Sequence, residues 1–571
     1  MDLSSHFCHT FPMSNKLKKP TVVDLSKMSR EELEDAYVQL YTRCAVAEAK
    51  ADRFLEEYRL SQQRRFGRSS EQSVAGQYSF TDFMKSNQPQ PIPAAVPTMN
   101  DDEAEIKRLV DKAIGAKQAA NKSNGPIPKK DLSGIEVRSV EFKLSKDKQV
   151  CSTCGSKLTF LSTTIHKELE IEPPKVYVKE YTTHHYVCHT CESQGCKHFV
   201  DAPGCPKPLF YGSPVAPSVV ADCIHKKYAL ALPFDRLAKD YKRQGIPITK
   251  DNMCKWSINS ALRFFKPIVE AMRQILLEEA AIHCDETYTL VLSWDRKKKS
   301  YVWVMTTAEY QKDHPIMIYN YRPGRSDTDA RAVLAGYHGY VMCDGYGCYT
   351  SVLKENHKTH APAMDIRPVA CMVHVKREFV DALKSLPKDK WHETGAYLAV
   401  AKLQNIFHID NEIEFETYEE RREKRMDVLY PAMVDFFDYM KAQKEESLPS
   451  TKYGKAITYA LNQEEKAMRL FEDGRLELDN NMAERTVKPY VISRKNSLFN
   501  DTERGAEASC ILFSIVETAK QNGLDVQKYL AYVLDQCRGI HKHEKLAPEK
   551  IQKLLPWSKS IPDEIKAPTN G

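Results

Sequence analysis

The sequence predicts a multidomain α/β protein: a mixed sheet flanked by helices, with a helical insertion, preceded by a small cysteine-rich domain and an N-terminal helical or coiled-coil region. Three observations support this fold class. Runs of β-forming residues alternate with helical runs after residue 280, two Cys-x-x-Cys pairs lie upstream of them, and a seven-residue apolar repeat precedes both. At 571 residues the chain is too long for one hydrophobic core, so about three to five units are expected.

An apolar seam in the N-terminal region predicts a helix. Apolar or small residues recur at alternating spacings of four and three from Leu33 to Tyr58, flanked by Glu, Arg and Lys. Both a coiled-coil dimerisation helix and a single amphipathic helix packed on its own domain fit this pattern. The RRFGRSSEQ turn and the proline-rich NQPQPIPAAVPTMN that follow predict an extended linker.

Composition indicates a folded protein of a reducing compartment. Hydrophobic residues make up 42% and charged residues 28%, and no apolar run is long enough to span a membrane. The N-terminus lacks the apolar core and cleavage site of an export signal, so a cytoplasmic location is expected. There, the 16 cysteines are better interpreted as metal ligands or buried thiols than as a disulfide framework. The net charge of +6 is compatible with a polyanionic partner but does not by itself argue for one.

Two Cys-x-x-Cys pairs, CSTC and CHTC, predict a structural zinc site. Two intervening residues place both thiolates of a pair on one side of a tight turn, and two such turns complete a tetrahedral Cys₄ site with no open position for water. The stretch between the pairs alternates like strands, as in a zinc-ribbon-like domain, where the metal replaces a core. The predicted Zn²⁺ ligands are Cys151, Cys154, Cys188 and Cys191, with His189, Cys196, His198 and Cys205 as neighbours that could replace one of them.

The segment 209–280 is predicted to be helical, and it contains the helix-end and helix-start signals of a helix-turn-helix. Gly245 is positioned to end one helix and Thr249 to cap the next. Such turns are also common in proteins that do not bind DNA. DNA recognition by the third helix and a purely structural helical collar are both compatible with this segment.

Three β-forming runs, AIHCDETYTLVLSW, KKKSYVWVMTTA and HPIMIYNYR, predict an antiparallel meander. The following segments complete the order β-β-β-α-β-α-β, which is that of an RNase H-like mixed sheet. In such a sheet the first and fourth strands are neighbours, so Asp285 in the first and Asp344 at the end of the fourth can approach each other. Two carboxylates suit Mg²⁺, which prefers hard oxygen ligands, although an Asp before Gly at a strand end is commonly only a turn or cap residue.

A resemblance over many blocks strengthens this interpretation. The run from RLELDNNMAERTVKPY to QNGLDVQKYL closely resembles the C-terminal catalytic signature of the IS66-family transposases of bacterial insertion sequences. HKKYALALPFDRL, HCDETYTLVL, CDGYGCY and CMVHVKREF resemble that family's other blocks in the same order, and the Cys₄ segment and the RRFGRSSEQ turn resemble its N-terminal regions. The resemblance covers about residues 30–540, and Val375 departs from the small residue typical of the family.

The resemblance implies a DDE catalytic triad at Asp285, Asp344 and Glu484. Two Mg²⁺ (or Mn²⁺) ions held by such acids would activate a water or a 3′-hydroxyl for DNA strand cleavage and strand transfer. The implied partners are double-stranded DNA with terminal inverted repeats, target DNA and companion proteins of the same element. Exchange between two DNA ends favours a homodimer or a higher oligomer as the active complex.

The block around Glu484 is itself typical of a surface that faces phosphate. Asn480 or Asn481 can cap a helix whose first turns carry Glu484. His374 is interpreted either as support for a metal ligand or phosphate, or as an ordinary structural histidine. The predicted contacts with the DNA backbone are Arg485, Lys488, Arg494 and Lys495.

The alternatives to a transposase are a non-catalytic zinc-dependent DNA-binding protein derived from one, and an RNase H-like DNA nuclease that cuts without joining. Intact acids favour an enzyme over a binding protein, but they do not separate strand transfer from hydrolysis. The predicted domains are a tail (1–29), a helical region (30–75), a linker (76–135), a zinc-binding domain (136–208), a helical domain (209–280), the first part of the catalytic core (281–378), a helical insertion (379–477), the C-terminal helices of the core (478–538) and a second tail (539–571).

Overall fold

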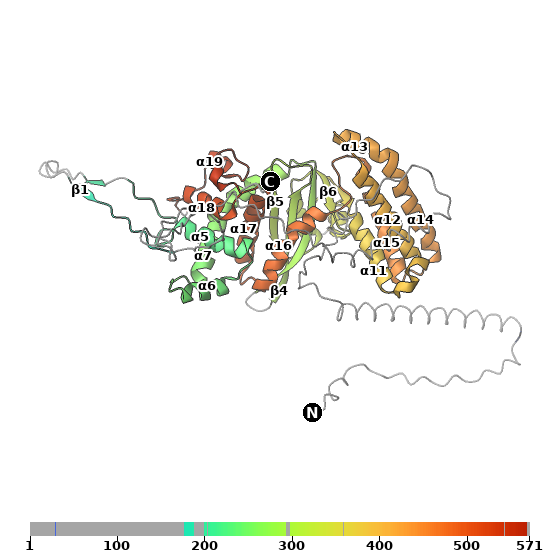
Figure 1. Ribbon diagram of the computed structural model, residues 1–571, viewed down its shortest axis with the longest axis horizontal. Helices are drawn as coiled ribbons and strands as arrows, with labels where there is room; N and C mark the ends of the chain where they lie inside the picture. Colours follow the sequence, from blue (N-terminus) through green and yellow to red (C-terminus); the bar gives the residue numbers. More distant parts are fainter. Residues whose placement is uncertain are drawn as a thin grey trace, which may run out of the picture.

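The computed structural model describes residues 29, 176–187, 199–201, 204–292, 297–357, 359–541 and 543–567. A five-stranded sheet lies between two groups of helices, and one further helix, α16, lies against the sheet (Figure 1). The predicted N-terminal helix, the linker and all four predicted zinc ligands lie outside the described residues. A separate two-stranded sheet is formed by β1 (His185–Val187) and β2 (Phe199–Asp201).

The five-stranded sheet has the order β5-β4-β3-β6-β7. Strands β3 (Ala281–Leu292), β4 (Lys297–Thr307) and β5 (Met317–Arg322) form an antiparallel meander, as the alternating pattern predicted. Strands β6 (Gly339–Cys343) and β7 (Ile366–Ala370) extend the sheet in parallel on the other side of β3. The predicted neighbourhood of the first and fourth strands is therefore confirmed.

The register between β3 and β6 brings two positions of interest side by side. Only three residues of β3 pair with β6, and the last of these pairs is His283 with Met342. Asp285 and Asp344 each follow this last pair by two residues, so both lie where the two strands separate. Such a point, at the carboxyl ends of parallel strands, is where α/β sheets typically bind ligands. Beyond it, the free edge of β3 is covered by Asn500, whose backbone bonds to Leu290 and Leu292.

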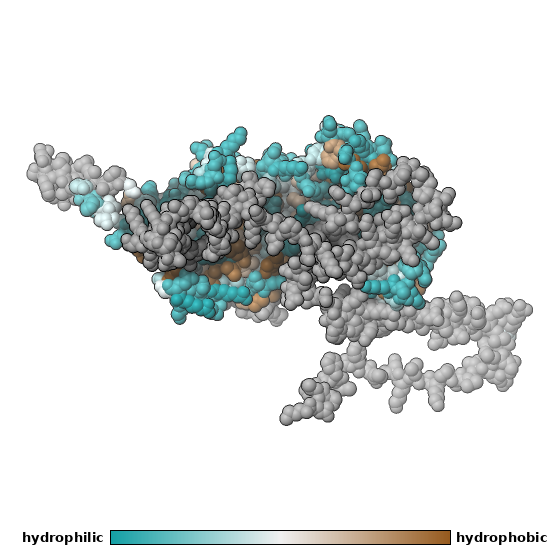
Figure 2. Space-filling view, viewed as in Figure 1, coloured by the Kyte–Doolittle hydropathy of each residue, from teal (hydrophilic) through white to brown (hydrophobic). Residues whose placement is uncertain are grey.

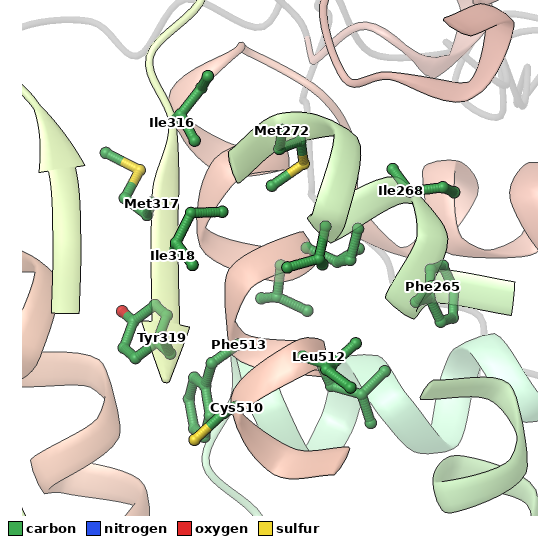
Figure 3. Close-up of a cluster of buried hydrophobic side chains, with 14 of the residues drawn as sticks. Phe265, Ile268, Met272, Ile316, Met317, Ile318, Tyr319, Cys510, Leu512 and Phe513 are labelled. Atoms are coloured by element: carbon green, nitrogen blue, oxygen red, sulfur yellow. The ribbon is translucent and has the colours of Figure 1, made fainter. Parts of the chain in front are cut away.

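One group of helices combines segments that are distant in the sequence. Its core contains side chains from η4, α8, β5 and α17, including Phe265, Met272, Ile318 and Phe513 (Figure 3). The shared burial of apolar side chains from segments that are far apart in the sequence holds these segments together. The helical elements of this group are α5 (Pro217–Ile224), η3 (His225–Ala229), α6 (Phe234–Arg243), α7 (Lys250–Ser260), η4 (Ala261–Phe265), α8 (Lys266–Leu276), α17 (Glu503–Gln521), α18 (Val526–Gln536), α19 (Pro548–Leu554) and η8 (Asp563–Ile565).

The predicted signals of a helix-turn-helix, a glycine at the end of one helix and a cap at the start of the next, are present between α6 and α7. Gly245 follows α6 with a φ of +75°, a conformation that favours glycine at the end of a helix. Thr249 caps α7 by accepting a hydrogen bond from the backbone N–H of Asn252, and the Asn252 side-chain oxygen accepts one from the Thr249 N–H. These two features fix the turn, and they leave both predicted roles of the segment open.

The second group of helices lies between β7 and α16 in the sequence. Helix α11 begins directly after β7 and packs against α12 and α15. The core of this group is separate from the first, although adjacent β6 residues contribute to different cores, Val341 to the first and Met342 to the second. Its helical elements are α11 (Met372–Lys384), η5 (Lys388–Glu393), α12 (Gly395–Glu412), α13 (Tyr418–Lys424), η6 (Arg425–Leu429), α14 (Tyr430–Glu446), α15 (Lys452–Met468) and η7 (Arg469–Phe471).

Two short helices complete the sheet connections, and one long helix returns to the sheet. Helices α9 (Asp327–Leu334) and α10 (Cys348–Ser351) join the strands, which gives the predicted order β-β-β-α-β-α-β. Helix α16 (Asn481–Ser497) packs against β3 and β4. Asn480 occupies the predicted N-cap position, but its side chain makes no capping bond. The Asp479 carboxylate instead accepts from the Asn481 backbone N–H at 2.8 Å.

The visible surface of the described residues is largely hydrophilic, with hydrophobic areas that include the region around α13 (Figure 2). Exposed apolar side chains in that region are Phe415, Met426, Val428 and Tyr430. Within the described residues, every helix is too short or too polar to cross a lipid bilayer.

Candidate active site

Asp285 lies on β3 in a crowded acidic environment. Its carboxylate accepts a hydrogen bond from the Glu286 backbone N–H at 2.7 Å. Burial raises the pKa of Asp285 to about 8, and the negative charges of Glu286, Asp344 and Glu484 act in the same direction. The structure thus brings the three predicted triad residues, from β3, the end of β6 and α16, into one electrostatic neighbourhood.

Asp344 follows β6 and is held by two groups. One carboxylate oxygen accepts a hydrogen bond from the Tyr346 backbone N–H at 3.0 Å, and the other lies 3.7 Å from a guanidinium nitrogen of Arg325. Arg325 in turn lies over the ring of Tyr346, 3.6 Å from its centroid, and the Tyr346 hydroxyl donates to the Arg325 carbonyl. Asp344 therefore has a defined orientation next to a fixed positive charge.

Glu286 and Arg325 are site residues that the sequence did not reveal. The Glu286 side chain is buried, bonded to Arg325, and accepts a hydrogen bond from the Tyr349 hydroxyl at 2.8 Å. Burial raises the pKa of Glu286, as does Asp344, while Arg325 opposes the rise. The only signals in the sequence were an acid next to Asp285 in CDET and an arginine in the turn before α9.

Glu484 lies in the first turn of α16 between two basic side chains of α11. One of its carboxylate oxygens lies 3.5 Å from Nε2 of His374 and 3.4 Å from a guanidinium nitrogen of Arg377. Burial lowers the pKa of His374, and Arg377 lowers it further, so the ring favours the neutral form. A neutral ring can still direct an Nε2–H at Glu484. The predicted support by His374 thus has a geometric basis, whereas the contribution of Arg377 was not foreseen.

A further acidic residue, Glu477, differs from Asp285 in the direction of its pKa shift. Burial acts to raise the pKa of Glu477, but His283, the Glu309 N–H and Arg421 together outweigh it and the pKa is lowered, so this carboxyl stays ionised. For His283, burial disfavours the charged ring, but Glu477 and Asn480 raise its pKa above the usual value. Glu477 and His283 therefore form a compensated pair, while the acids around Asp285 lack an equivalent positive partner for each charge.

The donor set around Asp285 fits a hard divalent cation. Carboxylate oxygens are the preferred ligands of Mg²⁺, and a cation would relieve the repulsion that raises the pKa of Asp285. As the side chains stand in the described part of the chain, no three His, Cys, Asp or Glu residues are gathered closely enough to hold one ion. Of the predicted zinc ligands and their alternatives, only Cys205 is described, and it is exposed.

The predicted DNA-contacting residues of α16 differ in their surroundings. Arg485, Lys488 and Lys495 are exposed. Arg494 instead donates to the Thr287 hydroxyl at 2.8 Å and to the Tyr288 carbonyl, and lies 3.8 Å from the centroid of the Tyr288 ring. Arg494 therefore joins α16 to β3, and its predicted contact with DNA stays a prediction, like those of the other three.

Comparison with known families covers more than half of the chain with one match. Residues 212–508 match the family described as the Transposase IS66 family. The chain belongs to this family. Three further regions match parts of IS66 transposases: residues 514–557 the IS66 C-terminal element, 148–192 the zinc-finger binding domain of transposase IS66, and 53–137 the domain described as Transposase C of IS166 homeodomain. The zinc-finger match contains all four predicted Cys ligands and supports Zn²⁺ binding.

Relatives of this IS66-family chain include three proteins of Sinorhizobium fredii. The protein named uncharacterized protein y4jD is 25% identical over 464 residues, which cover 80% of this chain and 86% of the relative. Uncharacterized protein y4qI is 26% identical over 58% of this chain and 60% of its own length, and uncharacterized protein y4hP is 23% identical over 71% and 73%. These relatives extend the similarity over most of the IS66 chain without naming an activity.

Proposed function

We propose that this IS66-family protein is a DDE-type transposase that cleaves DNA at the ends of an insertion sequence and joins them to target DNA. Asp285, Asp344 and Glu484 are the catalytic acids and the ligands of two Mg²⁺ (or Mn²⁺) ions. The observation that carries the proposal is the placement of these acids. Asp285 and Asp344 each follow the last pair between β3 and β6 by two residues, and α16, which carries Glu484, packs against β3. In agreement with this placement, the charges of Asp344 and Glu484 both raise the pKa of Asp285.

We infer that the catalytic domain has the RNase H-like fold. This inference is supported by the sheet, in which three antiparallel strands are followed by two parallel strands on the other side of the first. It is also supported by the positions of the acids, one on the central strand, one at the end of its parallel neighbour and one on the helix that packs against the central strand.

The chain's own groups would prepare the site for phosphoryl transfer. Bound Mg²⁺ would activate the attacking water or 3′-hydroxyl and stabilise the leaving oxygen. His374 and Arg377 hold Glu484, and Arg325 holds Asp344, so two ligands are oriented before substrate arrives. Arg325 and Arg377 also put fixed positive charge beside the position that a scissile phosphate would occupy.

Binding of DNA is assigned to several regions. Exposed Arg485, Lys488 and Lys495 would neutralise backbone phosphates next to the acids, which gives affinity without sequence choice. The N-terminal region and the zinc-finger region would recognise the terminal inverted repeats. A homodimer or a higher oligomer would hold two ends together with target DNA, with companion proteins of the same element assisting.

The test uses the full-length protein with labelled duplexes taken from both flanks of its gene, in Mg²⁺ or Mn²⁺. Asp285→Asn, Asp344→Asn and Glu484→Gln should each reduce strand cleavage by at least about a thousand-fold, because each removes a charged ligand at the reacting phosphate. The matched control is Asp365→Asn, which alters an aspartate whose side chain is 86% exposed, and it should cleave like the unaltered protein.

Product analysis separates the competing functions. Joined strands support a transposase, whereas metal-dependent nicks without joined strands support a nuclease of the same fold. DNA binding with no cleavage in either metal would support a non-catalytic binding protein. Cleavage that survives all three substitutions would disprove the assignment of the acids.

A further inference from the structure

We propose that Asn480 is a positioning residue that sets Glu484 against the strands bearing Asp285 and Asp344; this inference rests on the proposed function. Asn480 is fully buried and directly precedes α16, one helical turn before Glu484. Any displacement of Asn480 would move the start of the helix and with it the Glu484 carboxylate.

The carboxamide of Asn480 is bonded to the strand that carries Asp285. Its Nδ2 donates to the Cys284 carbonyl at 2.8 Å, and its Oδ1 lies 2.9 Å from Nδ1 of His283, which is in position to donate to it. Cys284 and His283 are the two residues before Asp285. The side chain thus joins α16 to β3 at the point where β3 separates from β6.

The backbone around Asn480 is bonded to the segment that follows β7. The Asn480 N–H donates to Sγ of Cys371 at 3.2 Å, and the Leu478 carbonyl accepts from the Met372 N–H at 2.8 Å. The Cys371 N–H in turn donates to the carbonyl of Cys343, the residue before Asp344. Asn480 therefore lies at a junction that joins the backbones bearing all three acids.

Neighbouring side chains leave Asn480 available for this role. Capping of α16 falls to Asp479, so the Asn480 side chain is not needed at the helix start. The other ring nitrogen of His283, Nε2, lies 3.3 Å from a Glu477 oxygen, and the second Glu477 oxygen accepts from the Glu309 N–H at 2.7 Å. Glu477 thus places a negative charge beside the ring that presents Nδ1 to Asn480. An unbonded carboxamide at this depth would be costly, so the buried network has few alternative arrangements.

The experiment measures Mn²⁺ binding to the full-length protein at pH 7.5 by the loss of the free-Mn²⁺ electron paramagnetic resonance signal, together with thermal unfolding. The site of interest is the part of the binding that Asp285→Ala removes.

Asn480→Ala removes both carboxamide bonds. Asn480→Asp is nearly isosteric and covers the case in which Asn480→Ala fails to fold. It keeps an acceptor for His283 but replaces the bond to the Cys284 carbonyl by a contact between two oxygens. Asn522→Ala is the matched control, because the Asn522 carboxamide at the end of α17 also makes two bonds, donating to the carbonyls of Pro315 and Thr518.

Both Asn480 variants should weaken Mn²⁺ binding at this site by ten-fold or more, which corresponds to about 1.4 kcal/mol. Asn522→Ala should bind Mn²⁺ like the unaltered protein even if it unfolds at a lower temperature. Unchanged Mn²⁺ affinity in Asn480→Ala or Asn480→Asp would overturn the positioning role while leaving the proposed function intact. If instead Asp285→Ala removes no Mn²⁺ binding, the proposed function fails, and the positioning role fails with it.

Discussion

At the scale of single residues, the surroundings of each acid decide its role. Asp285 has acidic neighbours and a pKa raised to about 8 by burial and by their charges, which is compatible with the proposed binding of a cation. Glu477 is as deeply placed, but His283 lowers its pKa and the carboxyl serves as a structural acceptor. Of these two carboxylates, one is thus proposed to bind a cation and the other is a structural acceptor, because the environment shifts the two pKa values in opposite directions.

A buried lysine provides a test of the same electrostatics through stability. Lys376 lies in α11 with 2% of its surface exposed, and burial lowers its pKa to about 8. The unfolded chain holds this proton more tightly than the folded one, so the cost is complete below about pH 8 and disappears as the pH rises towards the unfolded pKa of about 10.4. Replacing Lys376 by Met should therefore stabilise the protein by about 2–3 kcal/mol at pH 7 and by much less at pH 10.

Denaturant unfolding at pH 7 and pH 10 measures this difference. Lys239→Met is the control, because Lys239 is exposed and pairs with Asp235 in an exposed ion pair, and it should give no pH-dependent gain. Destabilisation by Lys376→Met at both pH values would show that favourable contacts of the ammonium, such as that with the ring of Phe407, outweigh its desolvation.

At the scale of elements, sequence patterns predicted the strands well and the interior of the site poorly. Alternation of apolar residues in β3 to β5 and the glycine after α6 are local signals, and both features are present in the structure. The contacts of Asn480 with His283 and of Arg494 with Thr287 join residues about two hundred positions apart. No local pattern encodes such pairs, and for this reason Asn480 was expected to be a helix cap and Arg494 was grouped with residues that contact DNA.

The cations of α16 should consequently separate into two classes. Replacing exposed Arg485 or Lys488 by Ala should weaken DNA binding and reduce the slope of log affinity against log salt by about 1 each, with little change in stability. Replacing Arg494 by Ala should destabilise the protein by about 1.5–3 kcal/mol, because charge-assisted bonds to Thr287 and Tyr288 are lost.

Salt titrations of DNA binding and denaturant unfolding are measured on the same variants. Arg504→Ala, which alters an exposed arginine at the start of α17, controls for general charge loss. If Arg494→Ala changes the salt slope and leaves stability unaltered, Arg494 contacts DNA and its bonds to β3 contribute nothing measurable.

At the scale of the whole molecule, the helices between β7 and α16 are joined to the candidate active site by more than the contacts of His374 and Arg377 with Glu484. The Tyr459 hydroxyl of α15 accepts from the backbone N–H of Gly345, next to Asp344, and lies so close that a Cβ at this glycine would meet the tyrosine ring at 2.6 Å. Buried Arg425 donates to the Leu476 carbonyl, in the segment that leads into α16, and is bonded through its remaining nitrogens to Asp410. These helices are thus mechanically connected to both Asp344 and Glu484.

The Arg425 connection can be tested separately from its contribution to stability. Arg425→Ala leaves Asp410 without its main partner and should cost about 3–5 kcal/mol, with a loss of strand cleavage. The double variant Asp410→Asn/Arg425→Met removes the uncompensated charge and keeps an acceptor for Arg421, so it should recover much of that stability. It cannot recover the bond to the Leu476 carbonyl. Cleavage should therefore remain impaired in a protein whose unfolding is close to normal, and cleavage that returns together with stability would show that this bond does not transmit position to α16.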